Sequence, residues 1–361
     1  MRRTAALIVG GGPAGSAAAI ALARAGIGAE LVERTEGPHD TVCGGFLGWD
    51  SLAALERLGL DPAALGARPI RRLRLISAKR EVEVDLPRLA AGLSRRTLDE
   101  ALLAAARKAG ASIRRGRTVR SADLTGRRVR LDDEEELAGE VLVLATGKHE
   151  LRGAARPVEL STRPLGLRSA LGAGPALAEA LEGVIELHLF DGGYAGLLMQ
   201  EDGTANLCLS ASRDRLKKAG GIEPLLARLA DELPAFGERL GQGEPGAWSA
   251  VSGVPYGWRA SETVGGVYRV GDQAAVIASL AGDGIAIALE SGVAAARAIA
   301  AGKPAPDFQR DWARRALRPI GLAEALRRSA ENPVARQAMM GLLGWFPSLA
   351  PLAARLTRIG G

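Results

Sequence analysis

The chain of 361 residues has only two cysteines, Cys43 and Cys208, and three histidines. Two cysteines cannot form the disulfide framework of a small secreted domain, so we expect a cytoplasmic protein. The histidines, at positions 39, 149 and 188, do not have the spacing of metal ligands, and we expect no metal. The chain has no Gly-x-Ser-x-Gly motif, so we expect no serine hydrolase.

Aromatic residues make up 4% of the chain, and only six of its 47 basic residues are lysines. We interpret the abundance of arginine, which gives a net charge of +6, as coding bias and a solvated surface. No basic stripe alternates with aromatic residues, so we expect no nucleic-acid partner. Hydrophobic residues make up 47% of the chain, which excludes a disordered chain and predicts about two domains.

Residues 4–23 carry no charge and follow two arginines, Arg2 and Arg3. By length alone this run could be a transmembrane segment or the core of a signal peptide. Its composition predicts instead a short strand at residues 7–9, a glycine turn at 10–15 and an alanine-rich helix at 16–25. We therefore expect a strand–turn–helix unit of a water-soluble domain.

The glycine turn has the spacing Gly-x-Gly-x-x-Gly at Gly10, Gly12 and Gly15. The first glycine permits a tight turn, the second lets the backbone approach a pyrophosphate, and the third lets the helix lie close to the strand. Free N–H groups at the start of the helix would then face the phosphates. Glu33 ends the second expected strand, where a carboxylate can bind ribose hydroxyls. The pattern predicts a dinucleotide site.

Two later segments favour FAD as the dinucleotide. The apolar residues 141–147 predict a buried strand that ends in Ala-Thr-Gly. Residues 267–272 predict another strand, which ends in Gly-Asp. Asp272 could bind the ribitol hydroxyls of FAD. A helix from Ile285 to about residue 301, preceded by Gly282 and Gly284, would direct its positive end toward the flavin ring.

These motifs, together with Ser-Arg-Arg-Thr-Leu-Asp at residues 94–99, occur in an order that resembles a known family. The chain is similar to FAD-dependent oxidoreductases of the para-hydroxybenzoate hydroxylase superfamily, and within it to the geranylgeranyl reductase family. The resemblance covers residues 7 to about 300. It implies that Arg95 contacts the FAD phosphates or approaches the flavin; from the residues alone, Arg95 could equally be a surface arginine at a helix start.

The segment Val-Cys-Gly-Gly at residues 42–45 is the feature that points toward the reductases. The resemblance places Cys43 near the flavin, where its thiol could donate a proton or could merely fill space. Two departures are evident. Thr146 stands where many hydroxylases have an aspartate, and the substrate motif of the reductases keeps Tyr194 but loses its Trp, Phe and Pro.

We therefore expect Cys43 and Tyr194 as catalytic residues. The expected FAD-binding residues are Gly10, Gly12, Pro13, Ala14, Gly15, Glu33, Arg34, Cys43, Gly44, Arg95, Ala145, Thr146, Gly147, Gly271, Asp272, Gly282, Gly284 and Ile285.

The expected fold is α/β, α+β overall, with a Rossmann-like FAD-binding domain, an inserted antiparallel-sheet substrate domain and a helical C-terminal tail. The FAD-binding domain would comprise residues 1–72, 95–160 and 264–304, and the substrate domain 73–94 and 161–263. Residues 305–361 form the tail, which is amphipathic and basic. It would pack on the FAD-binding domain or, alternatively, contact a membrane surface or cover a tunnel for a lipophilic substrate.

The first functional hypothesis is an FAD-dependent reductase that delivers hydride from flavin N5 to a C=C bond of a lipophilic, isoprenoid- or polyketide-like substrate. The second is a monooxygenase that hydroxylates an aromatic or polyketide substrate through a C4a-hydroperoxyflavin. The third is a flavoprotein without a substrate of its own. Thr146 and Cys43 favour the reductase. The donor, NAD(P)H or a reduced electron carrier, stays open.

Overall fold

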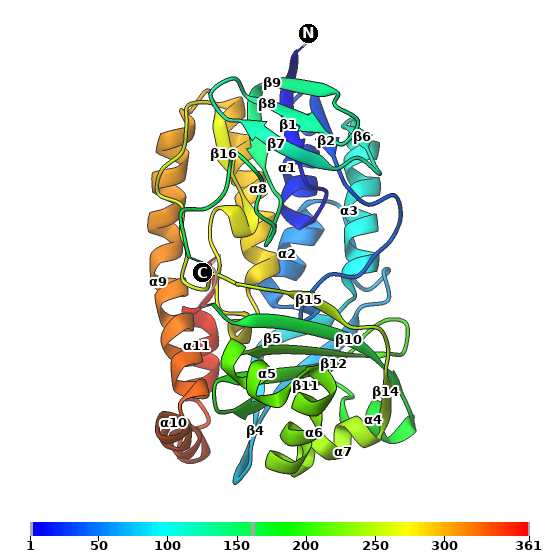
Figure 1. Cartoon of the computed structure of the whole chain (residues 1–361), viewed down its shortest axis with the longest axis vertical. Coiled ribbons are helices and arrows are strands. Elements are labelled where there is room, and N and C mark those ends of the chain that lie inside the picture. The colour runs from blue at the N-terminus through cyan, green and yellow to red at the C-terminus, as the bar shows by residue number, and fades with distance from the viewer. Residues whose placement is uncertain (1–2, 160–162, 360–361) are drawn as a thin grey trace.

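The computed structural model describes residues 3–159 and 163–359 and contains two mixed sheets connected by helices. The first sheet lies toward the N-terminus of the chain in Figure 1, and the second lies at the opposite end of the molecule. The α/β fold expected from the sequence is confirmed, with a Rossmann-like unit and a helical C-terminal region. The expected domain boundary at 160/161 lies outside the described residues, and the domain division stays a prediction.

The first sheet has a parallel core. Its strand order is β6 (Ser112–Arg114), β2 (Ala29–Val32), β1 (Arg3–Val9), β9 (Glu136–Leu144), β8 (Arg128–Leu131) and β7 (Val119–Asp123), with β16 (Val267–Arg269) also paired to β9. Strands β6, β2, β1, β9 and β16 pair in parallel, whereas β7 and β8 pair antiparallel.

Strand β1 is buried on both faces, because each face of the first sheet is covered. Ala6 and Ile8 pack against a helical layer. That layer is formed by α1 (Pro13–Arg24), α3 (Arg95–Ala109) and α8 (Gly284–Ala300). Leu7 and Val9 pack on the other face with side chains of the β7–β8 hairpin. This burial explains the uncharged run at the start of the chain, as expected for a parallel strand.

The second sheet is mostly antiparallel. Its order is β14 (Gly243–Pro245), β10 (Leu165–Ala173), β13 (Ala205–Ala211), β12 (Gly193–Met199), β11 (Val184–Phe190), β4 (Arg68–Ser77), β5 (Arg80–Gly92) and β3 (Phe46–Leu47), with β15 (Ser249–Val251) paired to β10. Strands β4 and β11 form its parallel pair. Strands β4 and β5 form a long hairpin that pairs Leu73 with Val84 and Leu75 with Val82.

The two faces of the second sheet have different neighbours. One face packs on a cluster that includes Phe190, Leu207 and Phe236. This side of the sheet carries four short helices, α4 (Pro175–Ala180), α5 (Arg213–Ala219), α6 (Ile222–Glu232) and α7 (Pro234–Gly241). The other face bears Leu187, Leu189 and Tyr194 and packs on C-terminal helices.

The C-terminal helices join the two sheets. Helix α9 (Ala305–Glu331) contacts both β16 of the first sheet and β11 and β12 of the second, and it forms the long column at the side of Figure 1. Helices α10 (Pro333–Trp345) and α11 (Leu349–Leu356) pack against β5. Helix α2 (Trp49–Arg57) packs on α8. The tail therefore packs on both sheets and not on the first alone. Among the described residues, no helix has the length and apolarity that a membrane crossing requires.

Charged side chains are buried within the second sheet around Glu186, which is fully buried. Its carboxylate accepts hydrogen bonds from Arg74 at 2.6 Å and Arg239 at 3.1 Å, and His188 Nε2 lies 3.1 Å away. Burial acts against ionisation, but the contacts with His188 and Arg239 lower the pKa of Glu186 to about 2. His188 therefore has a structural role in the second sheet. Its ring packs edge-on against the ring of Phe236, with 5.3 Å between the ring centroids.

The Glu186 network predicts a loss of stability in acid. Because the pKa of Glu186 is lowered on folding, its contribution is present above the unfolded value of 4.5 and is lost as the pH falls toward about 2. We expect Glu186→Gln to reduce the free energy of unfolding by on the order of 3 kcal/mol at pH 6 and by progressively less below pH 4. Urea titrations at several pH values measure this difference. The exposed Glu81→Gln, which removes only a 3.4 Å contact with Arg74, should change it by under about 0.5 kcal/mol at any pH.

Candidate functional site

A cavity of about 610 Å³ lies between the carboxyl ends of the first sheet and one face of the second. The glycine turn after β1, the ends of β2 and β9, residues 39–46 and the start of α3 supply one part of its lining. Gly166, Cys208 and Val254 supply a wall on the side of the second sheet. Its volume is in the range of cofactor and ligand pockets.

The glycine turn is shaped by close backbone contacts. Gly10 has φ +106°, and a Cβ there would lie 2.4 Å from the carbonyl oxygen of Ala145. A Cβ on Gly15 would lie 1.9 Å from the carbonyl oxygen of Gly10. Glycine is therefore required at both positions for α1 to start this close to the strand ends. Gly15 itself does not line the cavity, since its role is to permit this packing.

Helix α1 presents an open N-terminus to the cavity. Gly12 is its N-cap and offers no side-chain hydrogen bond, while Gly11, Gly12, Pro13 and Ala14 line the cavity. A phosphate can therefore approach the first backbone N–H groups of this helix without displacing a side-chain cap. This arrangement fits the pyrophosphate of a dinucleotide.

Glu33 lies next to the glycine turn and carries charge. Its carboxylate accepts hydrogen bonds from the backbone N–H of Gly11 at 2.6 Å and of Thr35 at 3.0 Å. Burial acts against ionisation, but these backbone hydrogen bonds lower the pKa of Glu33. A fixed carboxylate at this position fits the ribose hydroxyls of a dinucleotide.

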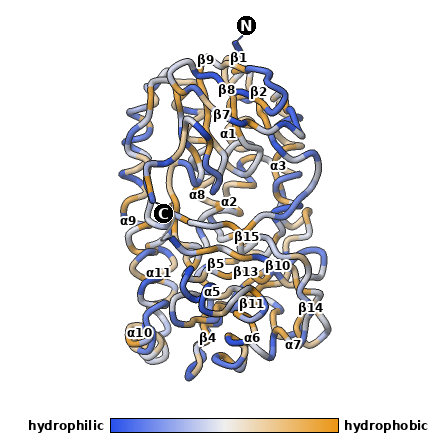
Figure 2. Tube along the Cα trace, in the orientation of Figure 1, coloured by the Kyte–Doolittle hydropathy of each residue, from blue (hydrophilic) through white to orange (hydrophobic). Residues whose placement is uncertain are grey.

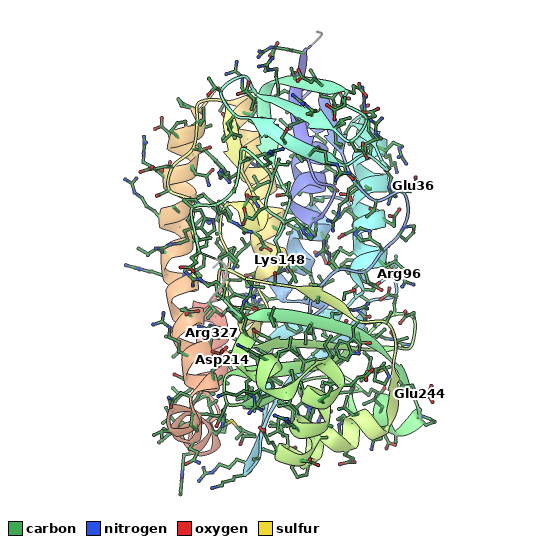
Figure 3. All side chains as sticks on the ribbon, in the orientation of Figure 1. Glu36, Arg96, Lys148, Asp214, Glu244 and Arg327 are labelled. Atoms are coloured by element: carbon green, nitrogen blue, oxygen red, sulfur yellow. The ribbon has the colours of Figure 1, made fainter. Side chains whose placement is uncertain are left out.

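Lys148, in the loop after β9, and Asp272, which follows β16, both line the cavity. Lys148 Nζ lies 3.4 Å from Asp272 Oδ2, and this attraction raises the pKa of Lys148 despite burial. The side chain of Gln273 donates to the carbonyl oxygens of Gly147 and His149, which fixes the loop. Lys148 lies where the two sheets meet, as its label in Figure 3 shows. A cation and a carboxylate thus stand side by side in the cavity.

Cys43 lies beside two cations. The guanidinium of Arg95 interacts with the thiol group and forms a double hydrogen bond to Asp99, at 2.8 and 2.7 Å. Although burial opposes the effect, Asp99 and Cys43 raise the pKa of Arg95, which therefore stays charged. Lys148 also interacts electrostatically with Cys43. Arg95 is thus a cavity residue and not a surface arginine.

The second sheet holds the Cys43 segment through buried polar side chains. Asn206 donates to the carbonyl oxygen of Cys43 at 3.1 Å. Arg168 donates to Asn206 at 2.8 Å and pairs with Asp40 at 2.9 Å, so it supports the same segment twice. Cys208, two residues beyond Asn206 on β13, also lines the cavity, and burial raises the pKa of its thiol to about 12.

Tyr194 reaches the cavity only through another residue. Its hydroxyl lies 2.5 Å from Ser279 Oγ and accepts a hydrogen bond from the N–H of Leu280. Tyr256 also contacts Ser279 Oγ, at 2.6 Å, and both Tyr256 and Ser279 line the cavity. The location of Tyr194 therefore favours a positioning role over direct contact with a substrate.

The start of α8 is anchored by the end of the chain. Arg358 donates to Asp283 at 2.9 Å and lies over the ring of Trp49, and the N–H of Ile359 donates to the same carboxylate. Burial raises the pKa of Asp283 to about 6 against the attraction of Arg358. These contacts fix residues 282–285, where Gly282, Gly284 and Ile285 line the cavity.

The cavity brings together the expected site residues with two exceptions, Gly15 and Tyr194. Sequence reasoning missed Asp40, Asp99, Lys148, His149, Cys208, Tyr256 and Ser279 as site residues. Lys148 directly follows the Ala-Thr-Gly strand end, which was a usable signal. His188 and Trp248 lie in the cluster on the opposite face of the second sheet.

Comparisons with known proteins agree with an FAD-binding fold. A family model described as an FAD binding domain matches residues 3–159. Menaquinone reductase of Mycobacterium tuberculosis (strain ATCC 25618 / H37Rv) is 30% identical over 370 residues, which covers 97% of this chain and 86% of that protein. Digeranylgeranylglycerophospholipid reductase 2 of Methanopyrus kandleri is 27% identical over 299 residues and covers 79% of this chain and 74% of its own.

Among solved structures, the flavin-dependent brominase Bmp2 superposes with a TM-score of 0.81 at 19% identity. The match covers 99% of this chain and 93% of the brominase. At this identity the likeness defines the fold and says nothing of the reaction.

The contact at Gly15 predicts a specific loss of flavin binding. We expect Gly15→Ala to displace the start of α1 from Gly10, so that the purified variant retains less than about a tenth of the wild-type flavin absorbance per chain. Gly28→Ala is the matched control, since its Cβ would meet nothing within 4 Å. Equal flavin content in the wild type and in Gly15→Ala would contradict this assignment of the turn.

Proposed function

The chain belongs to the FAD-dependent oxidoreductases of the para-hydroxybenzoate hydroxylase superfamily, and from this membership we propose that it reduces a carbon–carbon double bond of a lipophilic substrate. The relation to menaquinone reductase over nearly the whole chain carries the proposal. The names of that relative and of the digeranylgeranylglycerophospholipid reductase both denote reduction of a lipophilic molecule. An isoprenoid-like substrate is the class these names have in common.

Different residues at the cavity would bind FAD and the substrate. The open N-terminus of α1 and Glu33 would bind the pyrophosphate and ribose of FAD, and Asp272 with the start of α8 would hold its flavin end. Bound in its reduced form, FAD supplies a hydride from N5 of the ring. The wall formed by Gly166, Cys208 and Val254 would hold the substrate over that ring.

Cys43 is the group that we propose as proton donor. Reduction of a C=C bond consumes one hydride and one proton, so the site needs a proton source. The Cys43 thiol lies in the cavity beside Arg95 and Lys148, whose positive charges would stabilise the thiolate left after proton transfer. Asn206 would fix its position through the Cys43 carbonyl.

The wall of the second sheet favours an enzyme with its own substrate over an electron carrier, because a carrier needs only an exposed edge of the flavin ring.

Anaerobic turnover distinguishes the reductase from a monooxygenase. The FAD-loaded protein is reduced without oxygen and mixed with menaquinone or a geranylgeranyl lipid in detergent. We expect the flavin to reoxidise and the isoprenoid chain of the product to gain two hydrogen atoms, a gain that persists after air has reoxidised any quinol. Reoxidation that requires oxygen and yields a hydroxylated product would replace the proposal with a monooxygenase.

The role of Cys43 gives a second expected outcome. Cys43→Ala should lower kcat for the reduction by about 100-fold, the usual contribution of a positioned acid, and leave flavin content unchanged. Cys208→Ala, which removes the other thiol at the cavity, should lower it by well under tenfold, because that thiol holds its proton up to about pH 12. Stopped-flow reoxidation of the reduced flavin measures both. Equal rates in Cys43→Ala and the wild type would assign the proton to another donor.

A further inference from the structure

The helices at the C-terminal end expose large apolar side chains that no other described residue covers. Trp345 is 82% exposed and Phe346 58%, at the turn between α10 and α11. Leu342 precedes them, and Leu352 and Leu356 follow on α11, each more than half exposed. We call these five residues the C-terminal apolar surface. Figure 2 shows that much of α10 is hydrophobic. An exposed Trp–Phe pair beside leucines is typical of a binding surface and not of a solvated helix face.

Exposed basic side chains lie at this surface. Residues 333–361 contain no aspartate or glutamate. Arg336 and Arg358 pair with Asp191 and Asp283, so Arg355 is the exposed cation of this segment. Arg80, at the tip of the β4–β5 hairpin, comes within 3.3 Å of the position a Cβ on Gly341 would take, and Lys79 beside it is exposed. A second copy of the chain would bring these cations against their own equivalents across a twofold axis. An anionic lipid surface would neutralise them instead.

The surface also lies near the cavity. Helix α11 has eight residues and is about 12 Å long, and soon after its end Arg358 donates to Asp283 beside the cavity residues Gly282 and Gly284. On the inner side of α10, Met339 and Leu343 belong to the apolar cluster that contains Tyr194, whose hydroxyl contacts Ser279 at the cavity. Apolar packing is therefore continuous from α10 to the edge of the cavity.

We propose that the C-terminal apolar surface docks the protein on an anionic lipid bilayer, with Trp345 and Phe346 inserted among the headgroups. This inference rests on the proposed function in that it supplies the place where a lipophilic substrate is met. The apolar side chains provide the main attraction, and the exposed Arg355, Arg80 and Lys79 orient the surface toward anionic lipid. Docking would bring the cavity within about one short helix of the bilayer.

Vesicle sedimentation with the FAD-loaded full chain tests the docking. We expect the wild type to sediment with vesicles of phosphatidylcholine and phosphatidylglycerol, and less with phosphatidylcholine alone. The variant Trp345→Ser/Phe346→Ser should bind the anionic vesicles about tenfold more weakly or worse, because the inserted aromatic area is lost. Val264→Ser, an exposed apolar residue on the first sheet's side, is the control and should bind as the wild type does.

Three results would overturn the proposal: a wild type that stays in the supernatant, a double variant that binds as tightly as the wild type, or a wild-type dimer that the double variant converts to a monomer. A second measurement separates this proposal from the function. The double variant should reduce a short-chain soluble substrate at the wild-type rate and a long-chain substrate embedded in vesicles at least fivefold more slowly. Failure of the wild type to reduce either substrate would reject the function, while sedimentation would still decide the docking.

Discussion

The start of helix α1 packs so closely on three other segments that each contact requires glycine. Gly15 meets the carbonyl oxygen of Gly10, a Cβ on Gly292 of α8 would lie 2.2 Å from the carbonyl oxygen of Ala14, and one on Gly271 would lie 2.9 Å from the Cβ of Ala14. These contacts bring the ends of β1 and β9 and the helix α8 around one point. The cavity exists at that point because no side chain fills it.

The second sheet completes the site through a small number of buried polar contacts. Arg168 and Asn206 fix residues 40–43 from one side, and Arg95 and Lys148 approach Cys43 from the other. Buried charges are costly unless they are paired, and each of these cations has a carboxylate or amide partner. The pairing keeps the cations beside the thiol without leaving their charge uncompensated.

The C-terminal helices, residues 305–356, pack against both sheets. Helix α9 runs along both, and Arg358 returns to Asp283 at the start of α8. The start of α8 is thus held by the far end of the chain.

Local pattern was sufficient for much of the molecule. The strand, the glycine turn and Glu33 follow one another within 30 residues. Close backbone contacts at Gly10 and Gly15 permit no other residue type there. The dinucleotide-binding unit and the α/β fold could therefore be predicted from the sequence. Apolar residues alternate at positions 73, 75, 82 and 84, a pattern typical of a hairpin with one buried face, and β4 and β5 form such a hairpin.

Tertiary structure alone decided which distant side chains meet. Lys148 and Asp272 follow two strands that are neighbours only because β16 pairs with β9. Asn206 on β13 reaches the carbonyl of Cys43 across 163 residues of chain. Tyr194 looked like a residue in direct contact with substrate, yet the fold places Ser279 between it and the cavity. Periodicity determines which face of an element is buried, whereas long-range pairing determines what that face touches.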